Sequence, residues 1–216
     1  MKKISKERLV VAIDVGTTKI VVLIAQKQDN GFLDIVGIGK TASDGLRKGV
    51  VVDIARAVRS IKTAVKEAEL MADFEVEEAV VGISGAHIRS FNTKGAVPIA
   101  KGRVTQEDID QVVAAARAVP LSEGQHMLHV IPQYFCIDGS DRIQDPRNMH
   151  GVRLEADVHL VTGSISSVQN LVSCCEQAGV AVSDIVLEHL ASAQAVLSED
   201  EQQVGVGMVD IGGGTS

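Results

Sequence analysis

The stretches VAIDVGTT, residues 11–18, and GMVDIGGGT, residues 207–215, share one design. Each is an apolar run that ends in an aspartate, Asp14 or Asp210, and passes at once into a turn that contains glycine and threonine. Small residues let backbone N–H groups surround phosphate oxygens, threonine hydroxyls add donors, and an aspartate at a strand end can hold a hydrated Mg²⁺ ion. Either turn alone would be a tight β-turn with a solvated aspartate. The pair indicates a duplicated domain whose halves grip a nucleotide from both sides.

The composition favours buried parallel strands that pack against helices. Hydrophobic residues make up 45% of the 216 residues, which is enough for one sizeable core or two modest ones. Aromatic residues make up only 2%, so stacking platforms for bases are scarce. The formal net charge of -7 offers no basic face to a phosphate backbone, and the composition therefore argues against nucleic acid as a partner.

Cysteine usage and the first apolar run point to the cytosol. Cys174 and Cys175 are adjacent and Cys136 is distant, a pattern that fits neither a disulfide framework nor the paired spacing of a zinc site. Asp14 interrupts the first apolar run and Lys19 follows it, so that run predicts neither a signal peptide nor a membrane span. We therefore expect a cytoplasmic protein.

The first elements are predicted to be three strands, a helix and a fourth strand. The three strands form a meander from apolar runs at residues 9–13, 20–25 and 33–39. Asp53 caps a helix over residues 54–68, where apolar residues recur at helical spacing. Residues 79–83 lack alternation, which predicts a strand buried on both faces.

From Ser84 to Thr162 the apolar runs become shorter and turn residues more frequent. This change in pattern predicts an inserted subdomain of one helix and a few strands. Its helix begins at a capping box, Thr105 to Asp108, and its turn signals include Asn92 and Gly95. The main fold then resumes with predicted elements at residues 165–178 (a helix closed by Gly179), 185–187 (a strand), 190–197 (a helix) and 204–209 (a strand).

The meander, the crossover helix and the paired loops resemble the actin, Hsp70 and sugar-kinase superfamily. Five further stretches resemble the FtsA family of bacterial cell division proteins: ELMA at 69–72, GISGAHI at 82–88, VTQED at 104–108, HVIPQ at 129–133 and VRLEADVHL at 152–160. This likeness covers essentially the whole chain.

The resemblance implies an α/β fold, an actin-like (RNase H-like) ATPase domain with an inserted small α+β subdomain. Subdomain 1A would comprise residues 1–83 and 163–204, subdomain 1C residues 84–162, and the truncated start of subdomain 2A residues 205–216. The family's adenosine-binding loop and its C-terminal membrane-binding helix would lie beyond Ser216.

The resemblance also implies the residues that bind ATP and Mg²⁺. They form a first phosphate loop of Asp14, Gly16, Thr17, Thr18 and Lys19, and a second of Asp210, Gly212, Gly213, Gly214 and Thr215. Asp14 and Asp210 would hold Mg²⁺ through water. Glu188 matches the connecting motif, where related ATPases often keep a Gln or Glu near the attacking water. It is the candidate catalytic residue, and a solvated strand-end residue is the alternative.

By the same resemblance, the protein binds FtsZ, the tubulin-like division protein, and links the division ring to the inner face of the cytoplasmic membrane. It would recruit later division proteins through subdomain 1C and associate with itself into filaments, and whether it hydrolyses ATP stays open. Two alternatives also stay open. One is PilM, the actin-like pilus-assembly protein that shares the insertion, and the other is a metabolic kinase of the same superfamily.

Three weaker signals are set aside. GIGKTA at residues 37–42 fits a loose dinucleotide pattern, but no helix start follows it. Ser84 is predicted to be a hinge into the insertion, because Ala86 stands where a nucleophile elbow needs its second glycine. A basic stretch is interpreted as a solvated surface; it comprises Arg47, Lys48, Arg56, Arg59 and Lys62.

Overall fold

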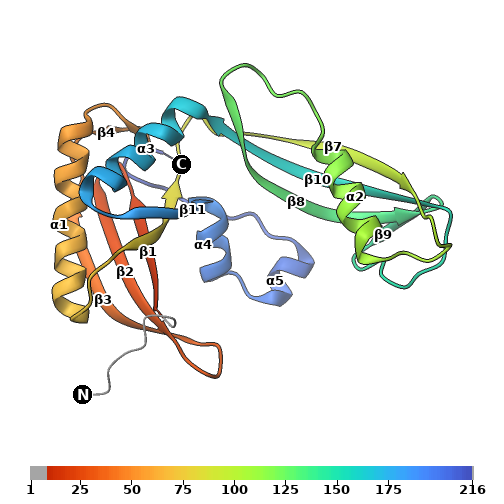
Figure 1. The fold of residues 1–216 in the computed structure, drawn as a ribbon, viewed down its shortest axis with the longest axis horizontal. Helices are drawn as coiled ribbons and strands as arrows, with labels where there is room; N and C mark the ends of the chain where they lie inside the picture. Colours follow the sequence, from red (N-terminus) through yellow and green to blue (C-terminus); the bar gives the residue numbers. More distant parts are fainter. Residues whose placement is uncertain (1–8, 216) are drawn as a thin grey trace. The chain divides into compact units, whose positions relative to one another are not determined.

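A computed structural model describes residues 9–215, so the ends of the predicted subdomain ranges, residues 1–8 and 216, lie outside the described residues. The chain divides into two compact units. Unit 1 comprises residues 1–87 and 165–216, and unit 2 comprises residues 88–164. Figure 1 labels most of the elements of both units.

Unit 1 is built on a five-stranded sheet in the order β11-β6-β1-β2-β3. The predicted meander is present as the antiparallel strands β1 (Leu9–Val15), β2 (Lys19–Lys27) and β3 (Leu33–Ala42). On the other side of β1, β6 (Glu78–Ile83) and β11 (Ala181–Leu187) run parallel to it. The carboxyl ends of these three parallel strands therefore meet at one edge of the sheet.

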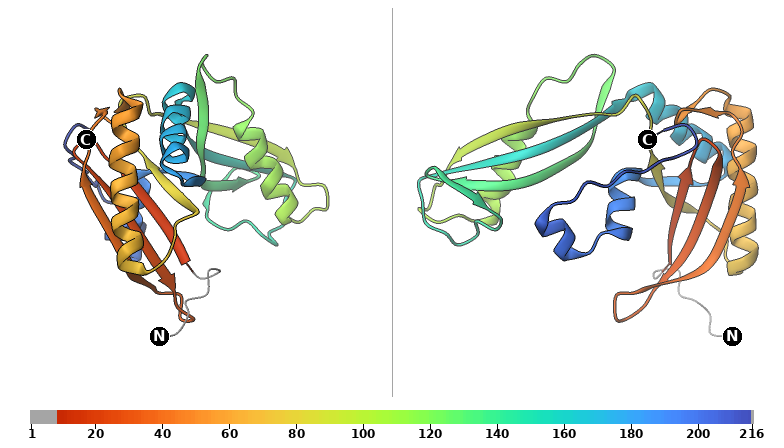
Figure 2. Two further views of the ribbon diagram at one scale, coloured as in Figure 1. Left: turned by 60° about the vertical axis from the view of Figure 1, so that its left-hand side comes forward. Right: turned by 180° about the vertical axis from the view of Figure 1, so that it is seen from behind.

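Two helices of unit 1, α1 (Ile54–Ala72) and α3 (Ile165–Ala178), pack against each other (Figures 1 and 2). Asp53 caps α1 as predicted, because its side chain accepts a hydrogen bond from the Arg56 N–H. α1 lies so close to β3 that a Cβ added at Gly39 would meet the Ala64 carbonyl oxygen. The glycines of the loose dinucleotide pattern are thus strand positions over which a helix packs.

The prediction that the fourth strand is buried on both faces is wrong. In β6, Ala79, Val81 and Ile83 are buried, whereas Val80 and Gly82 are only half-buried. The half-buried residues line an open cavity rather than a second layer of helices. One face of β6 is therefore available to a functional site.

The predicted strand at residues 204–209 is also absent. The helix predicted at residues 190–197 is present as α4 (Glu188–Val196), a short helix α5 (Glu199–Val204) follows it, and the chain then runs on without regular structure. A strand needs a neighbour for its backbone N–H and C=O groups, and none of the described strands pairs with this segment. Its apolar side chains remain largely in solvent: Val206 is 46% exposed and Ile211 81%.

Unit 2 is a four-stranded antiparallel sheet in the order β7-β10-β8-β9, with one helix. The strands are β7 (Arg89–Pro98), β8 (Gln125–Ile137), β9 (Ser140–Ile143) and β10 (Arg153–Ser164). α2 (Gln106–Arg117) starts at the predicted capping box, in which Thr105 and Asp108 bond reciprocally. Its buried face packs with the sheet around a separate core that includes Val112 and Leu154.

Two of the predicted turn signals in unit 2 are strand residues. Asn92 and Gly95 both lie in β7, where Asn92 Oδ1 accepts a 2.6 Å hydrogen bond from His159 Nδ1 of β10. A Cβ at Gly95 would meet the Val112 carbonyl oxygen of α2. This glycine therefore permits close helix packing, a requirement that a local turn rule cannot distinguish from a bend.

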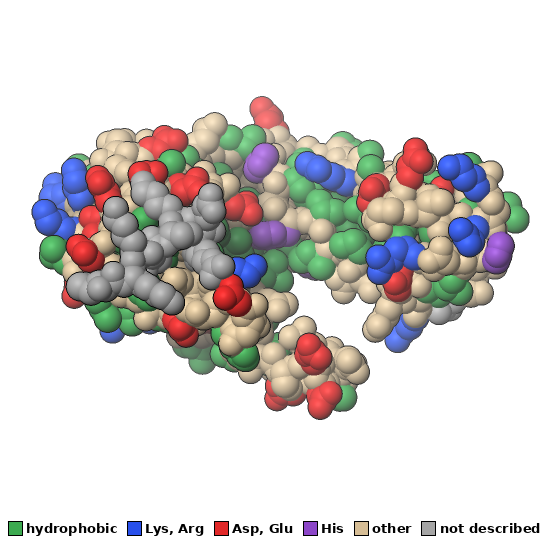
Figure 3. All heavy atoms as spheres, turned by 60° about the horizontal axis from the view of Figure 1, so that its bottom comes forward, with side chains coloured by type: hydrophobic (Ala, Val, Ile, Leu, Met, Phe, Trp, Pro, Cys, Tyr) green, Lys and Arg blue, Asp and Glu red, His purple; other side chains and the backbone are tan. Residues whose placement is uncertain are grey.

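The surface carries mixed charges on the face drawn in Figure 3, where acidic and basic side chains are interspersed. All three cysteines are buried and form no disulfide, and burial raises the pKa of the Cys175 thiol to about 12. None of the helices within residues 9–215 has both the length and the apolar composition needed to cross a membrane.

Candidate functional site

The two predicted phosphate loops line one cavity of unit 1, with a volume of 520 Å³. The cavity lies where the parallel strands β1, β6 and β11 end, which is the usual ligand position in α/β sheets. The residues of the predicted set that line it are Asp14, Gly16, Thr17, Thr18, Lys19, Glu188, Asp210, Gly212, Gly213 and Thr215. Gly214 lines an adjoining cavity of 440 Å³. The fold thus brings the whole predicted set together.

Both loops close with the same hydrogen bond. The Gly16 N–H donates to the Lys19 carbonyl oxygen at 3.1 Å, and the Gly212 N–H donates to the Thr215 carbonyl oxygen at 2.9 Å. Each glycine stands two residues after its aspartate. A Cβ at Gly16 would lie 2.8 Å from the Lys19 oxygen that it bonds, so a side chain there would open the turn. The matching closure supports a common role for the two loops.

The second loop rests directly on the first. A Cβ at Gly213 would meet the Thr18 side chain, and a Cβ at Gly214 would lie 2.7 Å from Thr17 Cγ2. Only glycine leaves room for this approach. A phosphate group held between the loops would have to separate these residues.

Three carboxylates enter the cavity from the two loops and from α4. Asp14 is the penultimate residue of β1, Asp210 precedes the second glycine turn, and Glu188 is the first residue of α4. Asp210 Oδ2 accepts a 3.0 Å hydrogen bond from the Ser192 hydroxyl. Ser192 follows Glu188 by four residues, so α4 presents both side chains on one face. That face of α4 lines the cavity between the two phosphate loops.

Burial raises the pKa of Glu188 to about 7. A hydrogen bond with Ser84 opposes this rise, while the charges of Asp14 and Asp210 add to it. Burial also raises the pKa of Asp14, and the Lys19 charge opposes that shift. The contact with the Glu188 carboxyl also opposes the rise in the pKa of Asp14, and the Asp210 charge adds to it.

Glu188 is a cavity residue rather than a solvated strand end. A Cβ at Gly82 would lie 3.1 Å from Glu188 Cγ, and the buried Glu188 Oε1 has no hydrogen-bond partner among the described residues. An unpaired buried carboxyl oxygen leaves acceptor capacity for a water molecule or a hydrated ion. Within residues 9–215, no group of three His, Cys, Asp or Glu is arranged to hold a metal directly. The role predicted for Asp14 and Asp210, holding Mg²⁺ through water, stays a prediction.

Sequence reasoning missed two hydroxyls of the site. Ser84, predicted to be a hinge, is buried and bonds Glu188. Ser192 bonds Asp210. The predicted helix began at residue 190, after Glu188, so the spacing of four residues between Glu188 and Ser192 became meaningful only with the observed start of α4.

Comparisons with known proteins point to one family. The family model for the SHS2 domain inserted in FtsA matches residues 85–162. The cell division protein FtsA of Pseudomonas aeruginosa is 45% identical over 216 residues, which cover 100% of this chain and 52% of that protein. FtsA of Escherichia coli K12 is 40% identical over 215 residues, covering 100% of this chain and 51% of that protein. FtsA of Bacillus subtilis is 40% identical over 214 residues, covering 98% of this chain and 48% of that protein.

A solved structure shares the fold at low identity. In the PilM-PilN type IV pilus biogenesis complex, a chain superposes with a TM-score of 0.56 at 12% identity, over 86% of this chain and 49% of that chain. Together with the SHS2 match, this confirms the predicted fold class, an actin-like α/β domain that carries an insertion. The chain spans about half the length of the curated relatives it matches.

Proposed function

Because this chain belongs to the FtsA family of cell division proteins, we propose that its two loops bind ATP with Mg²⁺ in a protein that anchors the division ring. The observation that carries the ATP site is the matched closure of the loops around one cavity. The N–H groups of a glycine turn are oriented donors, which suits them to phosphate oxygens. Bound ATP would supply a triphosphate whose charge Mg²⁺ offsets.

Each residue of the site has a proposed role. The backbone of Gly16 to Thr18 and of Gly212 to Thr215 would donate to phosphate oxygens, and Lys19 would contribute positive charge. Asp14 and Asp210 would accept hydrogen bonds from the waters of Mg²⁺, since carboxylates are favoured partners of that ion. Glu188, with its unpaired oxygen, would orient a water molecule next to the phosphates.

The cellular role that we propose is that of an adaptor. The whole protein would bind FtsZ, associate with itself and reach the inner face of the cytoplasmic membrane through a helix outside these 216 residues. Unit 2 would recruit later division proteins. One observation supports this division of labour: unit 2 is a compact unit with its own core.

Sequence identity favours an FtsA-like role over a PilM-like role. Several FtsA proteins match along essentially the whole chain at 40% identity or more, whereas the PilM structure matches at 12% and supports the fold alone. A metabolic kinase would need a substrate pocket, and no observation in the described residues favours one.

Calorimetry on the full-length protein tests the ATP site. We expect Mg-ATP to bind with a dissociation constant in the micromolar range, about -8 kcal/mol. Asp210→Asn should weaken binding in the presence of Mg²⁺, while Asp184→Asn, on the exposed part of β11, should not. Equal Mg-ATP affinity in the wild type and Asp210→Asn would remove the metal role of Asp210.

A deletion variant tests the adaptor role. The two ends of unit 2 are ladder partners, Arg89 with Thr162, so a short Gly-Ser linker can replace residues 88–164. This full-length variant should keep its affinity for Mg-ATP but fail to support division in cells. Normal division without unit 2, or loss of ATP binding with a folded unit 1, would contradict the proposal.

A further inference from the structure

A short hairpin lies beside the first phosphate loop. β4 (Leu46–Arg47) pairs with β5 (Val50–Val51), and the two residues between them are Lys48 and Gly49. Both have positive φ, 50° and 73°, as a tight two-residue hairpin of this type requires. Glycine and asparagine tolerate such a backbone, but lysine is strained there. Strained residues of this kind gather at functional sites.

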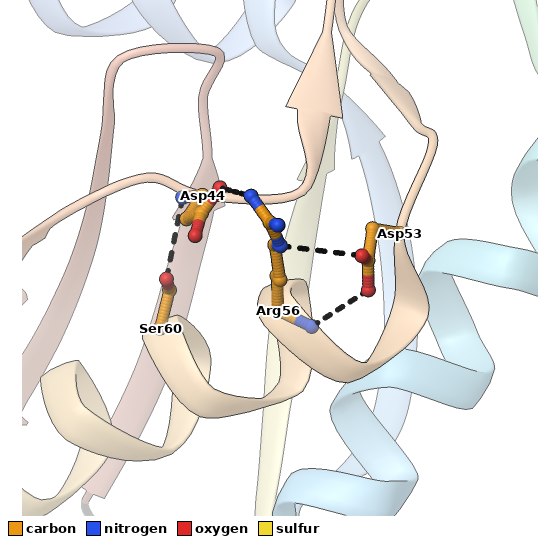
Figure 4. A network of polar contacts seen from close by, with 4 residues as sticks. All are labelled: Asp44, Asp53, Arg56 and Ser60. Carbon is orange, nitrogen blue, oxygen red and sulfur yellow. Dashed lines mark hydrogen bonds and ion pairs between the residues drawn. The ribbon is translucent and has the colours of Figure 1, made fainter.

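The base of the hairpin is fixed to the N-terminus of α1. Figure 4 shows Arg56 between two carboxylates: its guanidinium lies 3.5 Å from Asp44 and 3.3 Å from Asp53. The Ser60 hydroxyl accepts a 3.3 Å hydrogen bond from the Asp44 N–H. The N–H groups of residues 52 and 53 both donate to the Gly45 carbonyl oxygen. These contacts hold both ends of the hairpin on one helix.

The tip of the hairpin is fixed to the first phosphate loop. The Gly49 N–H donates to Thr17 Oγ1 at 3.0 Å. On its other side, a Cβ at Gly49 would lie 2.7 Å from the Ser84 carbonyl oxygen, and a Cβ at Gly85 would lie 3.1 Å from the Lys48 carbonyl oxygen. The tip therefore packs between the first phosphate loop and the segment after β6. These contacts fix the backbone position of Lys48.

Lys48 lines the 440 Å³ cavity together with the second phosphate loop and His189. Arg47 and Lys48 are both exposed, but Arg47 lies on β4 and lines neither of the two cavities, and Arg56 is paired with its two carboxylates. The basic stretch seen in the sequence is thus divided by the fold, and only Lys48 reaches the site.

The charge balance of the site calls for a second cation. Three carboxylates line the main cavity, and among the described residues that line the two cavities the Lys and Arg side chains are those of Lys19 and Lys48 alone. A triphosphate with one Mg²⁺ still carries net negative charge, and such a ligand next to carboxylates is stabilised by each additional cation.

We propose that Lys48 is a nucleotide-binding residue that contacts the terminal phosphate of a nucleoside triphosphate, so that the site distinguishes triphosphate from diphosphate. This inference rests on the proposed ATP site. The hairpin acts as a rigid arm that holds the ammonium group at the mouth of the cavity, next to Gly212–Thr215, while Lys19 serves the inner phosphates.

The test compares Lys48→Asn with Arg47→Ala in the full-length protein. Asparagine tolerates positive φ and removes the charge, so the hairpin is retained, and Arg47→Ala removes an equal charge one residue away. Calorimetry with Mg-ATP and with Mg-ADP gives both dissociation constants. For Lys48→Asn we expect an increase of about 10-fold for ATP and less than about 3-fold for ADP, as for loss of one charge-assisted contact. Lys48→Arg should restore most of the ATP affinity, and Arg47→Ala should change neither constant by more than about 2-fold.

The outcomes separate the two proposals. If the wild type binds ATP and Lys48→Asn weakens ATP and ADP equally, or no more than Arg47→Ala does, the assignment of Lys48 is overturned and the ATP site stands. If the wild type binds no nucleotide, the ATP site itself fails and the role of Lys48 fails with it. Far-ultraviolet circular dichroism and a thermal melt establish that each variant is folded before binding is compared.

Discussion

Replacing Glu188 by glutamine should make the stability of unit 1 less dependent on pH. Burial is the main cause that raises the pKa of Glu188 from 4.5 to about 7. A carboxyl with a raised pKa in the folded state makes a contribution to stability that is complete below its unfolded pKa and is lost as the pH rises through its folded pKa. Glutamine stays neutral throughout, so Glu188→Gln escapes that loss between pH 4.5 and about 7.

The size of the effect follows from the shift. One pKa unit corresponds to about 1.4 kcal/mol, so ionisation of Glu188 would cost the folded state at most about 3 kcal/mol. Glu188 is only half-buried, and solvent screening lowers this figure to about 1–2 kcal/mol. The free energy of unfolding of the variant should therefore gain about 1–2 kcal/mol on the wild type between pH 5 and pH 8.

Urea unfolding at pH 5 and pH 8 measures this difference. Glu176→Gln removes an exposed carboxylate of α3 and serves as the matched control, with an expected change within about 0.5 kcal/mol. If the unfolding free energies of the wild type and Glu188→Gln ran parallel over this pH range, the reasoning from burial of this carboxyl would be refuted.

Three further substitutions test the packing and the caps. Gly39→Ala should destabilise unit 1 by about 1–3 kcal/mol, because its Cβ would meet the Ala64 carbonyl oxygen, and a thermal melt measures the loss. Thr105→Ala should destabilise unit 2 by about 1 kcal/mol in urea unfolding, because the N-cap of α2 is lost. Ser192→Ala should speed amide hydrogen exchange at residues 211–215 by about 3- to 10-fold in the nucleotide-free protein, because Asp210 loses its hydrogen bond.

Two of these substitutions have a control within the chain. Gly207→Ala adds a Cβ where no neighbour lies within 4 Å, so its melt should match the wild type. Ser43→Ala removes a buried hydroxyl that has no hydrogen-bond partner among the described residues, and exchange at residues 211–215 should be unchanged by it. A stable Gly39→Ala protein, a Thr105→Ala protein with wild-type urea unfolding, or unaltered exchange in Ser192→Ala would each contradict the corresponding contact.

Elements with a local signal could be predicted from the sequence. Asp53 predicts the start of α1, because an N-cap bonds only to residues within the first turn of its helix. The two aspartate turns are recognisable because each is a continuous motif. Gly95 was misjudged because its role depends on α2, which lies later in the chain. The strand expected at residues 204–209 failed for a related reason: an apolar run becomes a strand only where another strand offers its backbone.

The residues of the candidate site also fall into those that sequence could identify and those that it could not. The residues of the two phosphate loops could be named from sequence, since each loop is one continuous stretch that contains its aspartate and its glycines. Ser84, Ser192 and Lys48 could not, because each belongs to a different segment and reaches the cavity only through the fold. Their chemistry is ordinary, and their position alone makes them functional candidates.

The contact between the two phosphate loops affects how fast a nucleotide can enter. Gly213 and Gly214 rest on Thr18 and Thr17, so phosphates gain access only in the fraction of molecules whose loops have parted. The measured dissociation constant then exceeds the intrinsic one by the inverse of that fraction, about 10-fold if one molecule in ten is open. In stopped-flow mixing, we expect the observed association rate to level off at the rate of loop opening as nucleotide concentration rises. A rate that kept increasing linearly would mean that the loops offer no barrier to entry.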